Sequence, residues 1–182
     1  MTLPLPVSRL RAKKSGAIIS YDPNYRASLW KNKNQAMKEM RSLLPITDMI
    51  KISSEEMGLL TGEEELDKAA GKLHDQGITL VVITLGADGA YVSLKRCNTM
   101  VAGFECRPID TTGAGDTFWG GFLSKFLSEQ KKLSQVSLED AAEYARYGNA
   151  AASLCVERRG AIPAIPSKLD VEQRIKNIQN SK

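Results

Sequence analysis

Short apolar runs alternate with longer amphipathic stretches along most of the chain, a pattern typical of an α/β protein with a largely parallel sheet. Residues 79–84, TLVVIT, form a continuous apolar and β-branched run, which predicts a strand buried on both faces. Further strands are predicted at residues 17–22, 48–53, 91–94 and 100–104. The order of these segments indicates a single α/β domain.

Apolar positions at helical spacing, together with capping residues, predict the helices. They fall at residues 34–44, 53–62, 64–76, 113–129 and 137–156, and a final polar helix follows Pro166. The helix at 113–129 should bury Phe118, Phe122, Leu123, Phe126 and Leu127 on one face. Ser137 with Asp140 three residues later resembles a capping box with a shorter acid.

Composition and charge narrow the class of protein. The 182 residues carry a net charge of +4, with much of the surplus at the two ends and no interleaving of aromatic with basic residues, so a nucleic-acid platform is not expected. No apolar run reaches the ~20 residues of a membrane span, and the basic opening lacks the features of a secretory signal, so we expect no membrane partner and a cytoplasmic location. The three cysteines are widely spaced and imply no disulfide framework, and His74, the single histidine, is expected at the surface.

The segment DTTGAGDTF, residues 110–118, carries the clearest chemical signal. Its glycines allow a ligand close to the backbone, and the amides of Ala114, Gly115 and Asp116 would point out of a helix start, where phosphate binds favourably. The Asp116 carboxylate could there accept a proton from an attacking hydroxyl. By spacing alone, a plain helix start, with Thr112 as cap and Asp116 complementing the dipole, explains the pattern as well. The glycine spacings of a P-loop and of a dinucleotide fingerprint do not occur.

The same segment, followed by Trp119 and a Gly-Gly-Phe, closely resembles the C-terminal signature of the PfkB/ribokinase family of carbohydrate kinases. The resemblance extends from about Gly16 to Pro166, and SYDPNYRASLW, residues 20–30, is most similar to bacterial fructokinases. It implies a three-layer α/β, ribokinase-like fold with a mostly parallel sheet, missing its N-terminal strands and lid. Residues 1–15 would be a basic leader or remnant helix, and residues 16–182 the C-terminal part of the kinase domain.

The resemblance also implies roles for individual residues. Asp116 corresponds to the catalytic base, and Gly113, Ala114 and Gly115 to the anion hole. The ATP-binding positions correspond to Thr84, Gly86, Asp88, Gly89, Asn149 and Ser53, and Glu56 to the acid of the magnesium and phosphate environment. A monovalent cation site corresponds to Asp110, Thr112 and Gly160, whereas Ala164 lacks a hydroxyl that some relatives supply there. The residues of a supporting loop correspond to Asp22, Asn24 and Arg26. Ser53 and Glu56 also have capping-box spacing, so a structural role explains them equally well.

The implied activity is transfer of a phosphoryl group from ATP, with Mg²⁺ and a candidate K⁺ as cofactors, to a sugar hydroxymethyl group. Fructose is the preferred sugar, and ribose or another sugar is the alternative within the class. A different class remains open, namely a non-catalytic nucleotide-binding or assembly module derived from a kinase half. The expected partners are the sugar and ATP, with either a homo-oligomer or a complementing N-terminal half.

Overall fold

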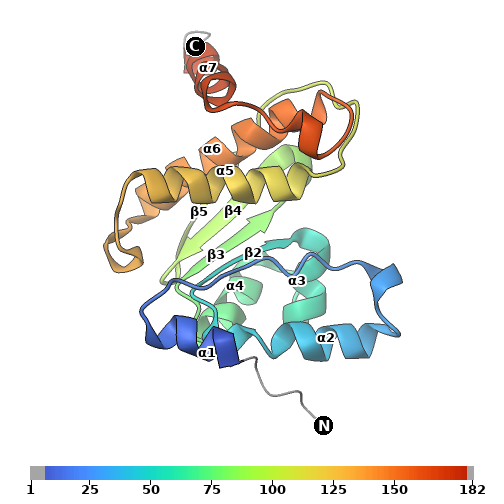
Figure 1. Ribbon diagram of the computed structural model, residues 1–182, viewed down its shortest axis with the longest axis vertical. Coiled ribbons are helices and arrows are strands. Elements are labelled where there is room, and N and C mark those ends of the chain that lie inside the picture. The colour runs from blue at the N-terminus through green and yellow to red at the C-terminus, as the bar shows by residue number, and fades with distance from the viewer. Residues whose placement is uncertain (1–6, 180–182) are drawn as a thin grey trace. The chain divides into compact units, whose positions relative to one another are not determined.

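A computed structural model describes residues 7–179, which form both helices and strands (Figure 1). The helices are α1 (Val7–Lys14), α2 (Lys33–Arg41), α3 (Ser54–Thr61), α4 (Leu66–Asp75), α5 (Ala114–Ser128), α6 (Leu138–Val156) and α7 (Lys168–Gln179). The strands are β1 (Ser20–Tyr21), β2 (Met49–Ser53), β3 (Leu80–Thr84), β4 (Gly89–Leu94) and β5 (Cys97–Ala102). The predicted α/β class is confirmed.

The described strands form one mixed sheet in the order β1-β2-β3-β4-β5. β1 and β2 are parallel, with Ser20 opposite Met49. The connections from β3 to β4 and from β4 to β5 are only a few residues long, so these neighbours must be antiparallel. By contacts, the chain divides into two compact units, one reaching Ile83 and including Ser93–Asn98, the other comprising Thr84–Val92 and the chain from Thr99 onward.

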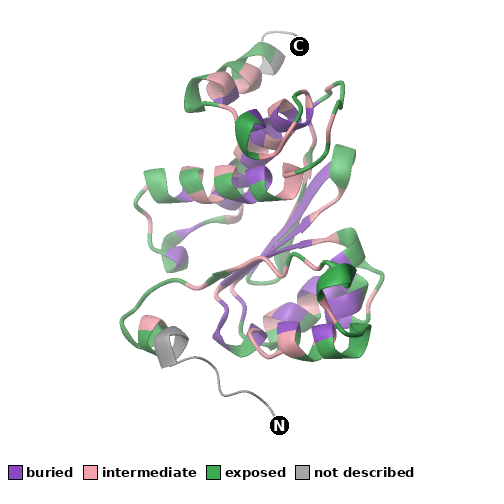
Figure 2. Cartoon of the chain, turned by 45° about the vertical axis from the view of Figure 1, so that its right-hand side comes forward, coloured by how far each residue is buried: buried purple, intermediate pink, exposed green. Residues whose placement is uncertain are grey.

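The first unit has its core between β2, β3 and helices α2, α3 and α4. Residues 80–83 of β3 are fully buried, as the continuous apolar run predicts, and Figure 2 shows purple, the colour of buried residues, along part of the sheet. Helix α3 begins at a capping box formed by Ser53 and Glu56 and ends at Gly62, whose φ of 74° is in the left-handed region that favours glycine. The local capping signals therefore place this helix correctly.

The second unit is built on the close packing of α5 against α6, with α7 against α6. An ideal Cβ at Gly148 would lie 2.7 Å from the Phe118 carbonyl oxygen, so glycine allows the two helices to approach. The apolar face of α5 differs from the predicted one at two positions. Leu127 is 68% exposed and Trp119 is buried, stacked on Phe122 at a centroid distance of 4.8 Å.

Two predicted strands differ in extent from the observed ones. β1 has two residues instead of the expected six, because the preceding Ile19 amide donates to the Asp48 carboxylate and not to a strand partner. β5 begins at Cys97, earlier than expected, because Lys95 and Arg96 both adopt positive φ and close a two-residue hairpin without any glycine.

His74 is not the plain surface residue that its polar surroundings predict. Its side chain is half-buried, and Nδ1 lies 2.7 Å from the Ile78 carbonyl oxygen, to which it must donate. Nε2 lies 2.8 Å from the Ser93 hydroxyl, which then donates to it. The imidazole thus joins α4 to β4, a role that depends on a partner far away in the sequence.

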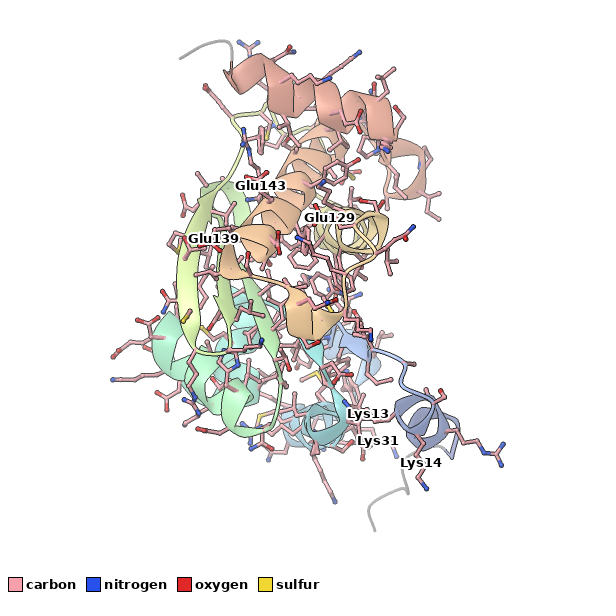
Figure 3. All side chains as sticks on the ribbon, turned by 90° about the vertical axis from the view of Figure 1, so that its left-hand side faces the viewer. Lys13, Lys14, Lys31, Glu129, Glu139 and Glu143 are labelled. Carbon is pink, nitrogen blue, oxygen red and sulfur yellow. The ribbon has the colours of Figure 1, made fainter. Side chains whose placement is uncertain are left out.

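The basic N-terminal segment is helical where the structure describes it. Figure 3 shows Lys13 and Lys14 projecting from α1, and Lys13 forms an ion pair with Asp48. Within the described residues, no helix has the length and apolarity to cross a membrane.

Candidate active site

The start of α5 has a backbone geometry that only glycine accommodates easily. Gly113 caps the helix with φ 80°, and an ideal Cβ there would lie 2.8 Å from the Ala161 Cβ. Thr112 does not cap the helix by its side chain, contrary to the plain-helix alternative. The amide of Ala114, one of the three predicted anion-hole residues, donates to the Thr111 carbonyl and so already has an acceptor.

Asp116 lies in the first turn of α5, exposed at the edge of a cavity of about 330 Å³. Within the described part of the chain its carboxylate has no hydrogen-bond or ion-pair partner. Gly113, Thr117 and Gly120 line the same cavity from α5, and Tyr147 lines it from α6. The amides of a helix's first turn have no intrahelical acceptor, so Asp116 combines a free carboxylate with nearby N–H donors.

The Thr117 hydroxyl holds the first turn of α5 against α6, because it donates to the buried Cys155 sulfur at 3.3 Å. The Thr117 amide donates to the Gly113 carbonyl at 2.8 Å. These two contacts fix the backbone on both sides of Asp116, so the carboxylate is presented from a rigid element.

Asp110 joins the segment before α5 to the loop after α6. Its Oδ1 accepts from the Thr112 amide and its Oδ2 from the Gly160 amide, both at 2.9 Å. The Thr112 hydroxyl and then the Gly160 and Thr112 amides lower the pKa of Asp110 from 3.8 to about 2. The three residues predicted to surround a monovalent cation therefore lie together, with both oxygens of the carboxylate engaged by N–H donors.

The lowered pKa predicts a loss of stability in acid. Because the folded pKa of Asp110 is below the unfolded value of 3.8, its contribution is fully present above that value and lost as the pH falls towards about 2. We expect Asp110→Asn to lower the melting temperature near neutral pH and the difference from wild type to shrink between about pH 5 and about pH 2. Thermal melts of both proteins across this range measure it. A difference that is constant with pH would contradict the assignment.

The predicted ATP-binding turn and Asn149 meet at the C-terminal end of β5. Leu85 donates its amide to the Gly89 carbonyl at 2.8 Å, which closes the turn around a single 3₁₀ turn at Gly86–Asp88. Asn149, buried on α6, donates from Nδ2 to the Val101 and Ala102 carbonyls, both at 3.1 Å. Its amide nitrogen is thus committed to the backbone, and its carboxamide oxygen is the atom left for a ligand.

Gly103 was not predicted, yet it fixes the same corner. An ideal Cβ at Gly103 would lie 2.2 Å from the Ala87 carbonyl oxygen, and one at Gly89 would lie 2.1 Å from the Val101 carbonyl oxygen. The two glycines thus let the turn and the end of β5 approach at backbone distance. A glycine at the end of an apolar strand was the available signal, but the sequence does not show what approaches it.

The remaining predicted residues lie in the first unit. Glu56, only 6% exposed, accepts the Ser53 amide at 2.8 Å and the Ser53 hydroxyl at 3.0 Å on Oε2. Its Oε1 accepts the Tyr25 amide at 2.6 Å. The structural reading of Ser53 and Glu56 as a capping box is confirmed, and the carboxylate also reaches the loop of Asp22, Asn24 and Arg26.

The structure therefore groups the candidate residues in three places. Asp110, Thr112, Gly113, Ala114, Gly115, Asp116 and Gly160 surround the start of α5; Thr84, Gly86, Asp88, Gly89 and Asn149 gather at the end of β5; and Asp22, Asn24, Arg26, Ser53 and Glu56 lie in the other unit. The cavity beside Asp116 is lined by residues of the first group and not by those of the second.

Residues 9–168 match the family model described as pfkB family carbohydrate kinase, and the chain belongs to this family. Fructokinase-2 of Solanum lycopersicum is 38% identical over 160 residues, which are 86% of this chain and 47% of that protein. The chain spans about half the length of the curated relatives that it matches.

Solved structures support the same fold. A fructokinase double mutant from Vibrio cholerae O395, with fructose, ADP and potassium bound, superposes with a TM-score of 0.84 at 30% identity, over 92% of this chain and 53% of that one. Fructokinase with bound ATP from Xylella fastidiosa superposes with a TM-score of 0.86 at 26% identity, over 95% and 56% of the two chains. The predicted ribokinase-like class is confirmed.

Proposed function

We propose that the protein carrying this chain is a kinase that phosphorylates a sugar hydroxymethyl group with ATP, and that the sugar is fructose. The observation that carries the proposal is the free Asp116 carboxylate in the first turn of α5, beside a glycine cap and a cavity. Membership of the pfkB family supports the reaction class, and the tomato and Vibrio relatives support fructose. Ribose or another sugar is the alternative acceptor.

In the proposed reaction Asp116 is the catalytic base that takes the proton of the attacking sugar hydroxyl. The amides of Gly115 and Asp116, at the positive end of α5, stabilise the charge on the transferring phosphoryl oxygens. Gly113 acts by shaping this helix start, since its conformation brings the backbone close to Ala161. The turn at residues 84–89 and the Asn149 oxygen are proposed to bind the nucleotide.

The proposal includes Mg²⁺, which when bound offsets the charge of the nucleotide phosphates. Magnesium in kinases is held largely by substrate phosphates and water, which does not require a protein cage. Glu56 suits an indirect role in this environment, because both its oxygens already accept donors from the chain. A K⁺ ion beside Asp110 is a candidate only, because the buried Ala164 offers no hydroxyl; nucleotide affinity compared in potassium and sodium buffers tests it.

The proposal predicts that the 182-residue chain binds ADP on its own, because the turn at residues 84–89, Asn149 and the start of α5 all lie within it. We expect weak affinity, in the range of about 0.1 to about 1 mM, because binding must also order the loops around the nucleotide. Isothermal titration calorimetry measures it, and Asn149→Leu should abolish it. Folded protein that gives no binding signal at millimolar ADP would contradict the nucleotide assignment.

The acceptor is tested by a coupled assay of ADP release in the full-length protein. Fructose should give the highest kcat/KM among fructose, ribose and glucose. A protein that releases ADP with ribose and not with fructose would keep the reaction class and replace the sugar.

The second candidate function is an assembly or nucleotide-binding module, which the end strand of the described sheet favours. β1 is the end strand of the described sheet, has two residues, and is preceded by the exposed Ile18. Strand edges of this kind pair with other chains. We therefore predict that the 182-residue chain self-associates in light scattering and shows no fructose-dependent ADP release. A monodisperse, active monomer would rule out this candidate.

A further inference from the structure

The loop of Asp22–Arg26 is held by two buried charged side chains from different elements, one through an ion pair and one through a hydrogen bond. Lys51 on β2 pairs with the Asp22 carboxylate at 3.1 Å, and the two side chains are only 6% and 15% exposed. Glu56 on α3 accepts the Tyr25 amide at 2.6 Å. A lysine buried in this way is uncommon, because removal of an ammonium group from water has a large free-energy cost unless it is paired.

The two contacts act on a segment with a left-handed residue in its middle. Asn24 has a φ of 46°, in the left-handed region, and its amide donates to Asp22 Oδ1 at 3.1 Å. The side chains of Asn24 and Arg26 are exposed, whereas the residues between and before them are partly buried. The backbone is therefore fixed from inside while two polar side chains face solvent.

We propose that Lys51 and Glu56 are positioning residues that fix the Asp22–Arg26 loop and thereby direct the Asn24 and Arg26 side chains. Lys51 holds the loop through Asp22, and Glu56 holds it through the Tyr25 amide while also capping α3. Burial raises the pKa of Asp22, although the nearby Lys51 lowers it. The negative charge of Glu56 raises the pKa of Asp22 as well. That Asn24 and Arg26 support a kinase active site rests on the proposed function. That Lys51 and Glu56 fix the loop does not depend on it.

Glu56→Asp separates the two roles of the carboxylate. Asp140 occupies the same position of the capping box that begins α6 and bonds the Ser137 amide at 3.0 Å, so an aspartate completes such a box in this chain. One methylene shorter, however, an aspartate at position 56 should not reach the Tyr25 amide. Hydrogen exchange of single amides, followed by NMR in the 182-residue chain, should show Tyr25 exchanging at least about tenfold faster with Ser53 changed less than about threefold.

Lys51→Met removes the other contact and keeps the length of the side chain. We expect the Asn24 and Tyr25 amides to exchange at least about tenfold faster, because the Asp22 carboxylate loses its partner. If the unpaired charge prevents folding, the double variant Asp22→Asn/Lys51→Met removes both charges and should give the same acceleration in a folded protein. Lys68→Met is the matched control, since its pair with Glu65 is 60% and 68% exposed; it should change neither amide.

Tyr25 exchange that is unchanged in Glu56→Asp, or loop exchange that is unchanged in the charge-free double variant, would overturn the proposal. The measurement uses no substrate, so such a result leaves the kinase assignment intact. A failure to bind ADP would conversely remove the kinase assignment without affecting the exchange rates.

Discussion

Asp116→Asn should lower the turnover of the full-length protein by at least about 100-fold, the low end for loss of a general base. Asparagine has nearly the same size and can still occupy the first turn of α5, but its amide cannot take the sugar proton. ADP affinity should change less than about threefold, because the backbone donors of the helix start remain. The assay is coupled ADP release with fructose, together with calorimetry of ADP.

A matched control for this variant is Asp67→Asn. Asp67 is also an exposed carboxylate in the first turn of a helix, α4, and its side chain accepts from Asn98. Its substitution should leave turnover within about twofold, since substitutions of exposed side chains without a special role usually have small effects. Asp116→Asn retaining more than about a tenth of wild-type turnover, or Asp67→Asn losing as much, would remove Asp116 from the role of base.

Features encoded in consecutive residues could be predicted from the sequence. The capping box of α3 and its end at Gly62 follow from residues within one helix, and so do the bounds of α6. The glycine-bounded start of α5, with Asp116 in its first turn, also follows from one short segment. In each case the physical cause lies within a few residues of its effect.

Features that depend on distant partners could not be predicted. The contact of Glu56 with the Tyr25 amide, 31 residues away, is invisible in either local pattern. The hydrogen bond between His74 and Ser93 joins α4 to β4, whereas the sequence predicts His74 to be a surface residue. The side-chain nitrogen of Asn149 donates to two carbonyls of β5, so only its side-chain oxygen is left for the proposed contact with a ligand. Such pairings are set by tertiary packing, which overrides local polarity.

The glycines illustrate the same division. Gly120 and Gly89 are equally permissive by residue type, but their environments in the structure differ. An added Cβ at Gly120 would meet nothing within 4 Å. At Gly89 it would lie 2.1 Å from the Val101 carbonyl oxygen and 2.5 Å from the Gly103 nitrogen. The sequence shows two permissive residues, whereas the structure shows one that is required and one that is not.

Gly89→Ala should therefore be among the most damaging single substitutions in the chain. Gly89 has φ 103° and ψ −125°, a region that is essentially restricted to glycine, and the atoms around the added Cβ belong to backbone, which cannot move aside as a side chain can. The strain and the overpacking together should destabilise the fold by about 3 kcal/mol or more. Urea unfolding followed by circular dichroism measures this change.

Gly120→Ala is the control, because alanine is more favourable than glycine in a helix interior by up to about 1 kcal/mol. The added Cβ at Gly120 would also meet open space. It should unfold at the same or a higher urea concentration than wild type. Where Gly89→Ala remains folded, the turn at residues 84–89 must withdraw from β5, and ADP should bind at least about tenfold more weakly, since the proposed nucleotide contacts are on that turn. A Gly89→Ala protein of wild-type stability would show that the turn does not need its close approach to Val101; one with wild-type ADP affinity would place the nucleotide elsewhere.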